Sequence, residues 1–189
     1  NAIRNIIDSI SFHESGGAVN DQNLAQGGGG PARGVMQFEP QRFKAAVQRA
    51  KNYYKDTYGK LFASESDLIT PEWLKNIPKR NLKYDKKGKA IRNRQFRLAQ
   101  QDITNLTVEQ QKALATYDLL QGPSNLADVT EGRTTVEDFW ADKWWKGDAS
   151  KRTEHIESFT RSIRNRDQRA AAAEAAAEAS QAQGDPLAD

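Results

Sequence analysis

Isoleucines near the amino terminus constrain the fold of this chain more than any other feature of its sequence. They follow the i, i+3, i+4, i+7 spacing of an amphipathic helix over residues 2 to 13, at Ile3, Ile6, Ile7 and Ile10. The Ser15-Gly16-Gly17 step is expected to end this helix. Glu14 therefore lies at the carboxyl end of a buried helix, where the helix dipole opposes a negative charge. This placement predicts a raised pKa for the Glu14 carboxyl.

Several capping patterns predict further helices. Pro40 opens one, and Thr70-Pro71-Glu72 reads as the cap and first turn of a short one that carries Trp73 and ends before Pro78. Thr107 and Gln110 match a capping box for a helix that runs to about Leu120. Thr135 caps a helix with three tryptophans, Trp140, Trp144 and Trp145. These tryptophans are interpreted mainly as packing residues, with a sugar-stacking platform as the alternative.

Two segments depart from this helical pattern. Residues 79 to 97 hold nine Lys or Arg residues against one Asp, and the DKKGK centre predicts a small β-hairpin. This hairpin is interpreted as a solvated charge run, with attraction to anionic cell-wall strands as the alternative. A last helix, from near Ser150, runs into the low-complexity sequence RAAAAEAAAEAS and is expected to break at QGDPLAD.

The predicted fold is therefore all-α (mainly α) with one small β-hairpin. Residues 1–167 are expected to form the domain, and residues 168–189 an alanine-rich helical extension or linker. A mean hydropathy of −0.83 agrees with a solvated extension, and no apolar run reaches the roughly 18 residues of a membrane span. The formal net charge of +3 is too small to indicate nucleic acid, and no specific nucleic-acid partner is expected. Because the chain starts with Asn1, it is expected to be a segment of a longer protein.

Three motifs occur in order along the first two-thirds of the chain. They are Glu14-Ser15 at the helix end, Gly34-Val35-Met36-Gln37 about twenty residues later, and Ala115-Thr116-Tyr117-Asp118 with Gly122. The stretch between the first two motifs is glycine-rich, with four consecutive glycines from position 27 to 30. Together these motifs resemble the soluble lytic transglycosylase family of the lysozyme-like superfamily. Asp118 stands where that family usually has Asn, and Val35 replaces a Leu.

The resemblance implies a lysozyme-like fold that cleaves the β-1,4 bond between N-acetylmuramic acid and N-acetylglucosamine in peptidoglycan. Glu14 would be the catalytic general acid and then the base, and the product a 1,6-anhydro sugar. Ser15 and Gln37 would hydrogen-bond the substrate or the acid, Met36 would line the saccharide site, and Tyr117 would orient Glu14. Such chemistry requires a carboxyl that stays protonated near neutral pH. No cofactor or metal is expected, since HESGG lacks the second His of a zinc-binding H-E-x-x-H motif.

Two other functions remain open at this stage. A hydrolytic lysozyme would use Glu14 with a second carboxylate, either Asp21 or Asp118. A non-catalytic module that grips the cell wall would use neither. The expected setting is a phage virion protein that opens the wall of the host during infection and meets other virion proteins through its carboxyl-terminal helical extension. The alternative setting is the bacterial periplasm.

Overall fold

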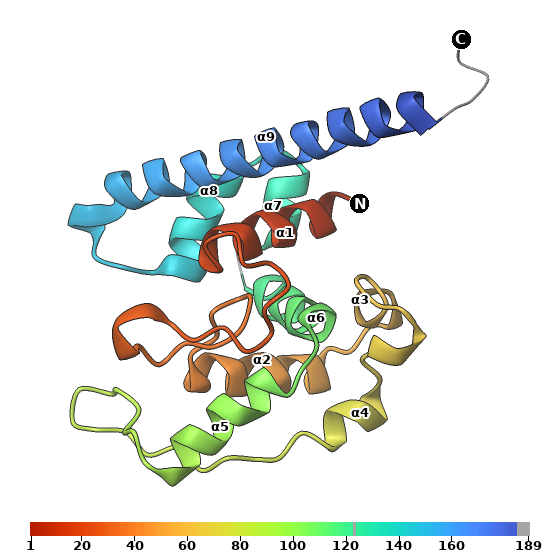
Figure 1. Cartoon of the computed structure of the whole chain (residues 1–189). Coiled ribbons are helices and arrows are strands. Elements are labelled where there is room, and N and C mark those ends of the chain that lie inside the picture. Colours follow the sequence, from red (N-terminus) through yellow and green to blue (C-terminus); the bar gives the residue numbers. More distant parts are fainter. Residues whose placement is uncertain (123, 185–189) are drawn as a thin grey trace.

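The computed structural model describes residues 1–122 and 124–184, which form a mainly helical domain with a long final helix (Figure 1). This confirms the predicted all-α fold class. In the described ranges the α-helices are α1 Ala2–Glu14, α2 Pro40–Asn52, α3 Asp56–Gly59, α4 Pro71–Lys75, α5 Arg94–Thr104, α6 Val108–Leu119, α7 Leu126–Thr130, α8 Val136–Phe139 and α9 Arg152–Gly184. Short 3-10 turns at Gly27–Gly29, Glu65–Asp67 and Ala149–Lys151 and a π-helical segment at Trp140–Trp145 complete the pattern.

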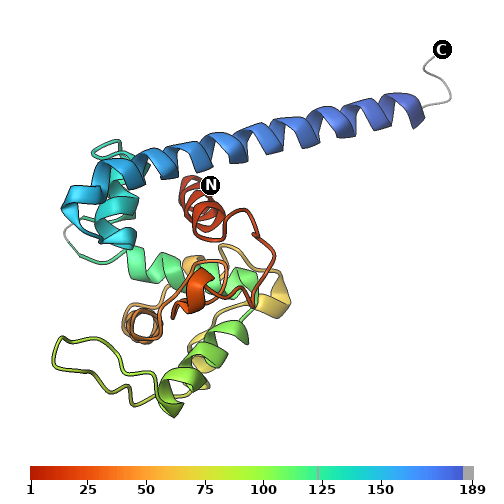
Figure 2. The same cartoon turned by 60° about the vertical axis from the view of Figure 1, so that its left-hand side comes forward.

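Helix α6 lies at the centre of the molecule. It packs on α1 on one side and on α2 on the other, while α9 crosses α1 and α8 at the outer face (Figures 1 and 2). Its capping box is confirmed: the Thr107 side chain accepts from the Gln110 backbone and the Gln110 side chain accepts from Thr107. Residues on almost every face of α6 are buried, as expected for a helix with partners on several sides.

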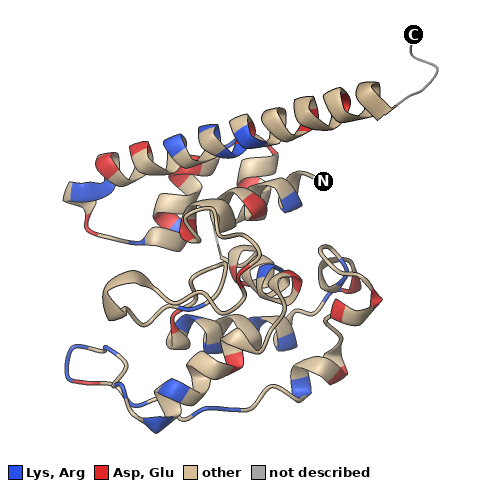
Figure 3. Ribbon diagram, in the orientation of Figure 1, with Lys and Arg blue, Asp and Glu red and all other residues tan. Residues whose placement is uncertain are grey.

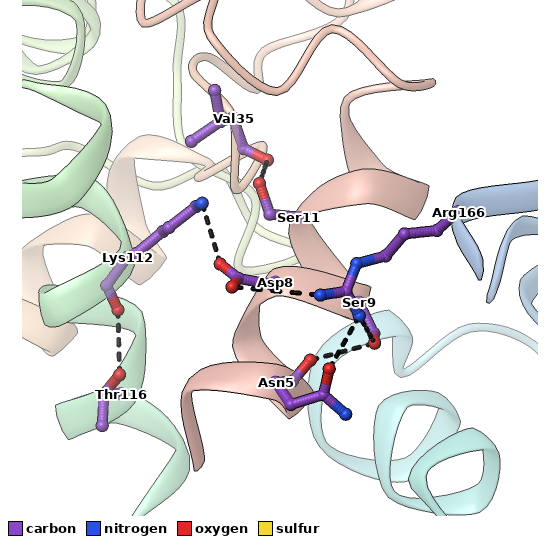
Figure 4. A network of polar contacts seen from close by, with 8 residues as sticks. All are labelled: Asn5, Asp8, Ser9, Ser11, Val35, Lys112, Thr116 and Arg166. Carbon is purple, nitrogen blue, oxygen red and sulfur yellow. Dashed lines mark hydrogen bonds and ion pairs between the residues drawn. The ribbon is translucent and has the colours of Figure 1, made fainter. Parts of the chain in front are cut away.

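The expected isoleucine face of α1 is confirmed. Ile6, Ile7 and Ile10 are buried in the core, and Ile3 is partly buried against it. The polar side of the same helix carries Asp8, which pairs with Lys112 of α6 at 2.9 Å and approaches Arg166 of α9 at 4.0 Å (Figure 4). Helix α1 is therefore fixed to both neighbours by ion pairs as well as by apolar packing.

The hairpin is shorter than the predicted range of residues 79 to 97. In the described structure its ladder is the single bridge between Tyr84 and Ala90, and the predicted second arm continues into helix α5, which starts at Arg94. Asn93 begins that helix because its side chain accepts the backbone N–H of Phe96 at 3.1 Å. Figure 3 shows that basic residues gather around this loop and along the adjoining edge of the molecule.

Helix α9 continues without interruption through the alanine-rich sequence. Its side chains are exposed from residue 167 to residue 184, so the predicted division between domain and extension lies within one continuous helix. Most of the expected break at QGDPLAD, residues 185–189, lies outside the described residues. None of the helices in the described ranges combines the length and the apolar character needed to cross a bilayer.

Candidate active site

A groove of about 560 Å³ opens beside the end of α1. Helix α2, the last turn of α6 and the π-helical segment supply its walls, and the glycine-rich loop supplies its rim. Its lining includes Glu14, Gln26, Gln37, Glu39, Arg42, Arg49, Asp118, Trp144, Trp145 and Lys146. A smaller hollow of about 210 Å³ lies between α2, α5 and residues 77–82, and its one carboxyl, Asp102, is paired with Arg80. The larger groove is the candidate active site because it contains the Glu14 carboxyl.

Glu14 is the last residue of α1 and keeps part of its surface exposed to the groove. Burial raises the pKa of Glu14 to about 7, while the hydrogen bond from Trp140 and the positive charge of Arg42 both act to lower it. The predicted direction of the pKa shift is therefore confirmed, with burial as its main cause. A carboxyl with this pKa is divided between its protonated and ionised forms at neutral pH, as a general acid that later acts as a base requires.

The indole of Trp140 is the direct partner of Glu14. Its Nε1 donates to Glu14 Oε1 at 2.8 Å, and the Trp140 residue is only 1% exposed. The ring stacks on Phe159 of α9, with centroids 4.7 Å apart and planes at 12°, and more loosely on Trp145 at 6.2 Å. Packing was the main interpretation of these tryptophans, and the hydrogen bond was missed. A buried indole N–H usually has a hydrogen-bond acceptor, and this was the sequence signal for the bond to Glu14.

His13 closes the other side of Trp140. Its ring meets Trp140 edge-on at 4.8 Å, and its Nδ1 lies 2.6 Å from the Ser162 hydroxyl of α9. Burial, with a smaller contribution from His155, lowers the pKa of His13 to about 4. The imidazole next to Glu14 is therefore neutral at pH 7, and it acts as a packing group rather than as a counter-charge.

Gln37 lies in the groove with Glu14, as the resemblance implied. The residue has a left-handed φ of 50°, and its Nε2 donates to the Gly34 carbonyl at 2.9 Å. Gly34 itself has a φ of 82°, and a Cβ there would lie 2.1 Å from Oε1 of Gln111. The tight turn that presents Gln37 therefore depends on glycine at position 34.

Gln111 of α6, which the sequence analysis missed, holds this turn in place. Its Oε1 accepts the backbone N–H of Val35 at 2.8 Å, and its Nε2 donates to the Gln22 carbonyl at 3.0 Å. Ser11 of α1 adds a buried bond from its hydroxyl to the Val35 carbonyl at 3.0 Å. A glutamine on a helix gives no sign in the sequence that it reaches a loop some 75 residues earlier, so this contact required the tertiary structure.

Met36 and Ser15 do not take the places that the resemblance implied. Met36 is completely buried in the core rather than in the groove lining. Ser15 is buried, and its hydroxyl points back to the Phe12 carbonyl of its own helix at 3.5 Å. Neither residue is among those that line the groove, although their chain neighbours Glu14 and Gln37 are.

Tyr117 does not orient Glu14. Its hydroxyl donates to the Lys55 carbonyl at 2.7 Å and receives the Lys55 backbone N–H at 3.1 Å, and its ring packs against Tyr54 and Tyr58. Burial raises the pKa of Tyr117 to about 12. The residue therefore fixes the connection between α2 and α3.

The two proposed second carboxylates have different positions. Asp21 is exposed outside the groove and accepts the Asn23 backbone N–H in a local turn, so a direct role beside Glu14 is wrong. Asp118 does line the groove, but its side chain is only 4% exposed and forms ion pairs with Arg42, at 2.9 Å, and with Arg49. Glu39, which was not predicted, also lines the groove, and its carboxylate accepts from Gln41 at 2.6 Å.

Comparison with protein-family models, curated proteins and solved structures finds no match to this chain. Within the described residues, no three His, Cys, Asp or Glu side chains lie together as a metal-binding group would require.

Proposed function

We propose that this chain is a peptidoglycan lytic transglycosylase in which Glu14 is the single catalytic carboxyl. The observation that carries the proposal is the state of Glu14: it lies in an open groove, and its pKa of about 7 leaves it able both to give and to take a proton at neutral pH. The protonated form would donate to the glycosidic oxygen as the bond to C1 breaks, with the N-acetyl group of the substrate assisting. The resulting carboxylate would then take the proton of the C6 hydroxyl as O6 bonds to C1 and forms the 1,6-anhydro ring.

The surroundings of Glu14 support this assignment. The groove lining includes Gln37 at the loop and the partly exposed Trp145 at the π-helical segment, which offer an amide and an aromatic side chain to a sugar. Of the other two groove carboxyls, Asp118 is held by two arginines and Glu39 accepts a hydrogen bond from Gln41, which leaves Glu14 as the proposed acid. A hydrolytic lysozyme that uses Asp118 is the second candidate, because that residue lines the same groove as Glu14.

The proposed setting is a phage virion protein that reaches the host periplasm, with a bacterial periplasmic enzyme as the alternative. Helix α9 favours a role within a larger assembly, because it extends well beyond the domain with every side chain from residue 167 to residue 184 exposed. Other virion proteins are the proposed partners of that helix, and glycan strands are the proposed partner of the groove.

Mass spectrometry of the fragments released from purified peptidoglycan tests the reaction. Wild-type protein is expected to release glycan ends one water lighter than hydrolysed ends, and the Glu14→Gln variant none. Hydrated ends would instead assign a lysozyme and direct attention to Asp118. If neither protein releases fragments while both sediment with the wall, the chain is a wall-binding module.

A further inference from the structure

Positive charge is concentrated at the end of the groove that contains Asp118. Arg42 and Arg49 of α2 both pair with Asp118, and Lys146 lines the groove with them. Lys146 has no carboxylate partner among the described residues. Three cations therefore face one buried carboxylate.

Two other carboxyls line the groove, and both act at Arg42. Glu39 stands three positions before Arg42, and the charge of Arg42 acts on the pKa of Glu14. Glu39 stands ten positions before Arg49, so their backbones are about 15 Å apart along the axis of α2. The pKa of Lys146 is held below its ordinary range, first by burial and then by the charge of Arg42, although Asp118 acts in the opposite direction. Among the described residues Arg49 pairs only with Asp118 and Lys146 pairs with no carboxylate, so these two cations are the ones that a bound anion would stabilise.

The three cations have different degrees of freedom. The Arg42 guanidinium lies 3.8 Å from the Trp144 ring centroid and donates to the Trp144 carbonyl at 2.6 Å, so it is fixed in place. Arg49 is freer: its side chain is 42% exposed, and within the described chain only its Nη1 is used in hydrogen bonds. Its remaining guanidinium N–H groups are available to a ligand.

Lys146 is exposed, but its backbone is held. It ends the π-helical segment with a left-handed φ of 50°, and its N–H donates to the Ala141 carbonyl at 2.9 Å. Such a conformation is uncommon for a residue other than glycine and needs support from its surroundings. Lys146 is thereby held among the residues that line the groove, together with Arg42 and Arg49 of α2.

We infer that Arg49 and Lys146 form a carboxylate-binding subsite, which selects glycan strands that carry free carboxylates on their peptide stems over neutral N-acetylglucosamine polymers. The inference rests on the proposed function, because it uses the groove that contains Glu14. A planar carboxylate suits the free N–H groups of Arg49, and Lys146 adds a second positive charge in the same groove. Asp118 then has a structural part, since it holds both arginines in position without neutralising them.

Binding to the Glu14→Gln protein tests this subsite without cleavage. The probes are a peptidoglycan fragment with free stem carboxylates, the same fragment after its carboxylates have been amidated, and a neutral chitin oligomer. The free-carboxylate fragment is expected to bind about ten-fold more tightly than its amidated form, as the loss of one charge-assisted hydrogen bond predicts. Adding Arg49→Gln or Lys146→Gln should lower the ratio of the affinities for the free and the amidated fragment, and the double variant should bring it close to one.

Lys44→Gln is the matched control, because Lys44 lies on α2 but lines the hollow on its other side. This variant should keep the preference, and thermal unfolding of each variant should show that its fold is intact. Equal affinity for the free and amidated fragments would overturn the subsite but leave the proposed reaction standing. Failure of all three probes to bind would overturn both the subsite and the glycan as ligand.

Discussion

Replacing Trp140 by Phe removes one hydrogen bond from the proposed catalytic acid and leaves a smaller aromatic ring in a buried position. Phe keeps an aromatic ring between Phe159 and Trp145, but it loses the N–H that donates to Glu14 at 2.8 Å. Because that N–H stabilises the ionised carboxylate more than the neutral acid, its loss should raise the pKa of Glu14 further above 7.

The size of the change follows from the kind of bond that is lost. A hydrogen bond to a charged group contributes about 1.5 to 3 kcal/mol, and one pKa unit corresponds to about 1.4 kcal/mol. Since Glu14 is partly open to the groove, water can replace part of the lost bond. We therefore expect the lower end of this range, an increase of about one pKa unit.

The pKa can be measured directly by NMR titration of protein labelled with ¹³C at the glutamate carboxyl. The Glu14 resonance is the one that disappears in Glu14→Gln. If the chain cleaves peptidoglycan as proposed, the alkaline limb of its kcat/KM profile should move by the same amount, because the free enzyme must be protonated to donate. Trp73→Phe is the control, since Trp73 packs at the core edge on α4. An unchanged Glu14 pKa in Trp140→Phe would refute the reasoning.

Three further predictions concern stability. Folding raises the Glu14 pKa from 4.5 to about 7, so burial of its charge does not destabilise the fold below pH 4.5 and destabilises it fully above about pH 7. Denaturant titrations of Glu14→Gln should therefore give a free energy of unfolding up to about 3 kcal/mol above that of wild type at pH 8 and almost equal to it at pH 4. Gly34→Ala should lower the free energy of unfolding by about 2 to 4 kcal/mol, because Ala is strained at a φ of 82° and its Cβ displaces the Gln111 side chain; Gly88→Ala, with a φ of 77° but open space, is the control and should cost only the strain. A chain that ends after Arg169 should melt within about 2 °C of the full chain, because the described side chains beyond it are exposed; a larger fall would mean that they contact the domain.

Local signals in the sequence were sufficient for most helices. The side chains of the three capping residues each accept a backbone N–H at the expected helix start: Thr70, Thr107 and Thr135. Residues 94–97 were assigned to the hairpin but belong to helix α5. The assignment failed because a run of basic residues is compatible with a strand or with the exposed side of a helix. The spacing of Phe96, Ala99 and Ile103, which α5 buries, was the signal that distinguished them.

The site was predictable only where a residue is fixed by its own helix or turn. The position and the pKa direction of Glu14 followed from the end of α1, and Gln37 followed from the turn at Gly34. Met36, Ser15 and Tyr117 were misplaced because a motif gives the order of residues but not which side of the backbone faces the groove. Trp140 and Gln111 were missed because they reach the site from elements more than 70 residues away.

Glu14 and Asp118, two of the three carboxyls that line the groove, have different surroundings. Asp118 receives two guanidinium groups, whereas Glu14 is partly open to the groove, receives one neutral indole N–H and lies beside a neutral imidazole. If Asp118 acted as a base, protonation would weaken its ion pairs with Arg42 and Arg49. Protonating Glu14 at neutral pH costs almost nothing, because its pKa is about 7. In the proposed reaction, Glu14 therefore first gives a proton to the glycosidic oxygen and then takes one from the C6 hydroxyl of the substrate.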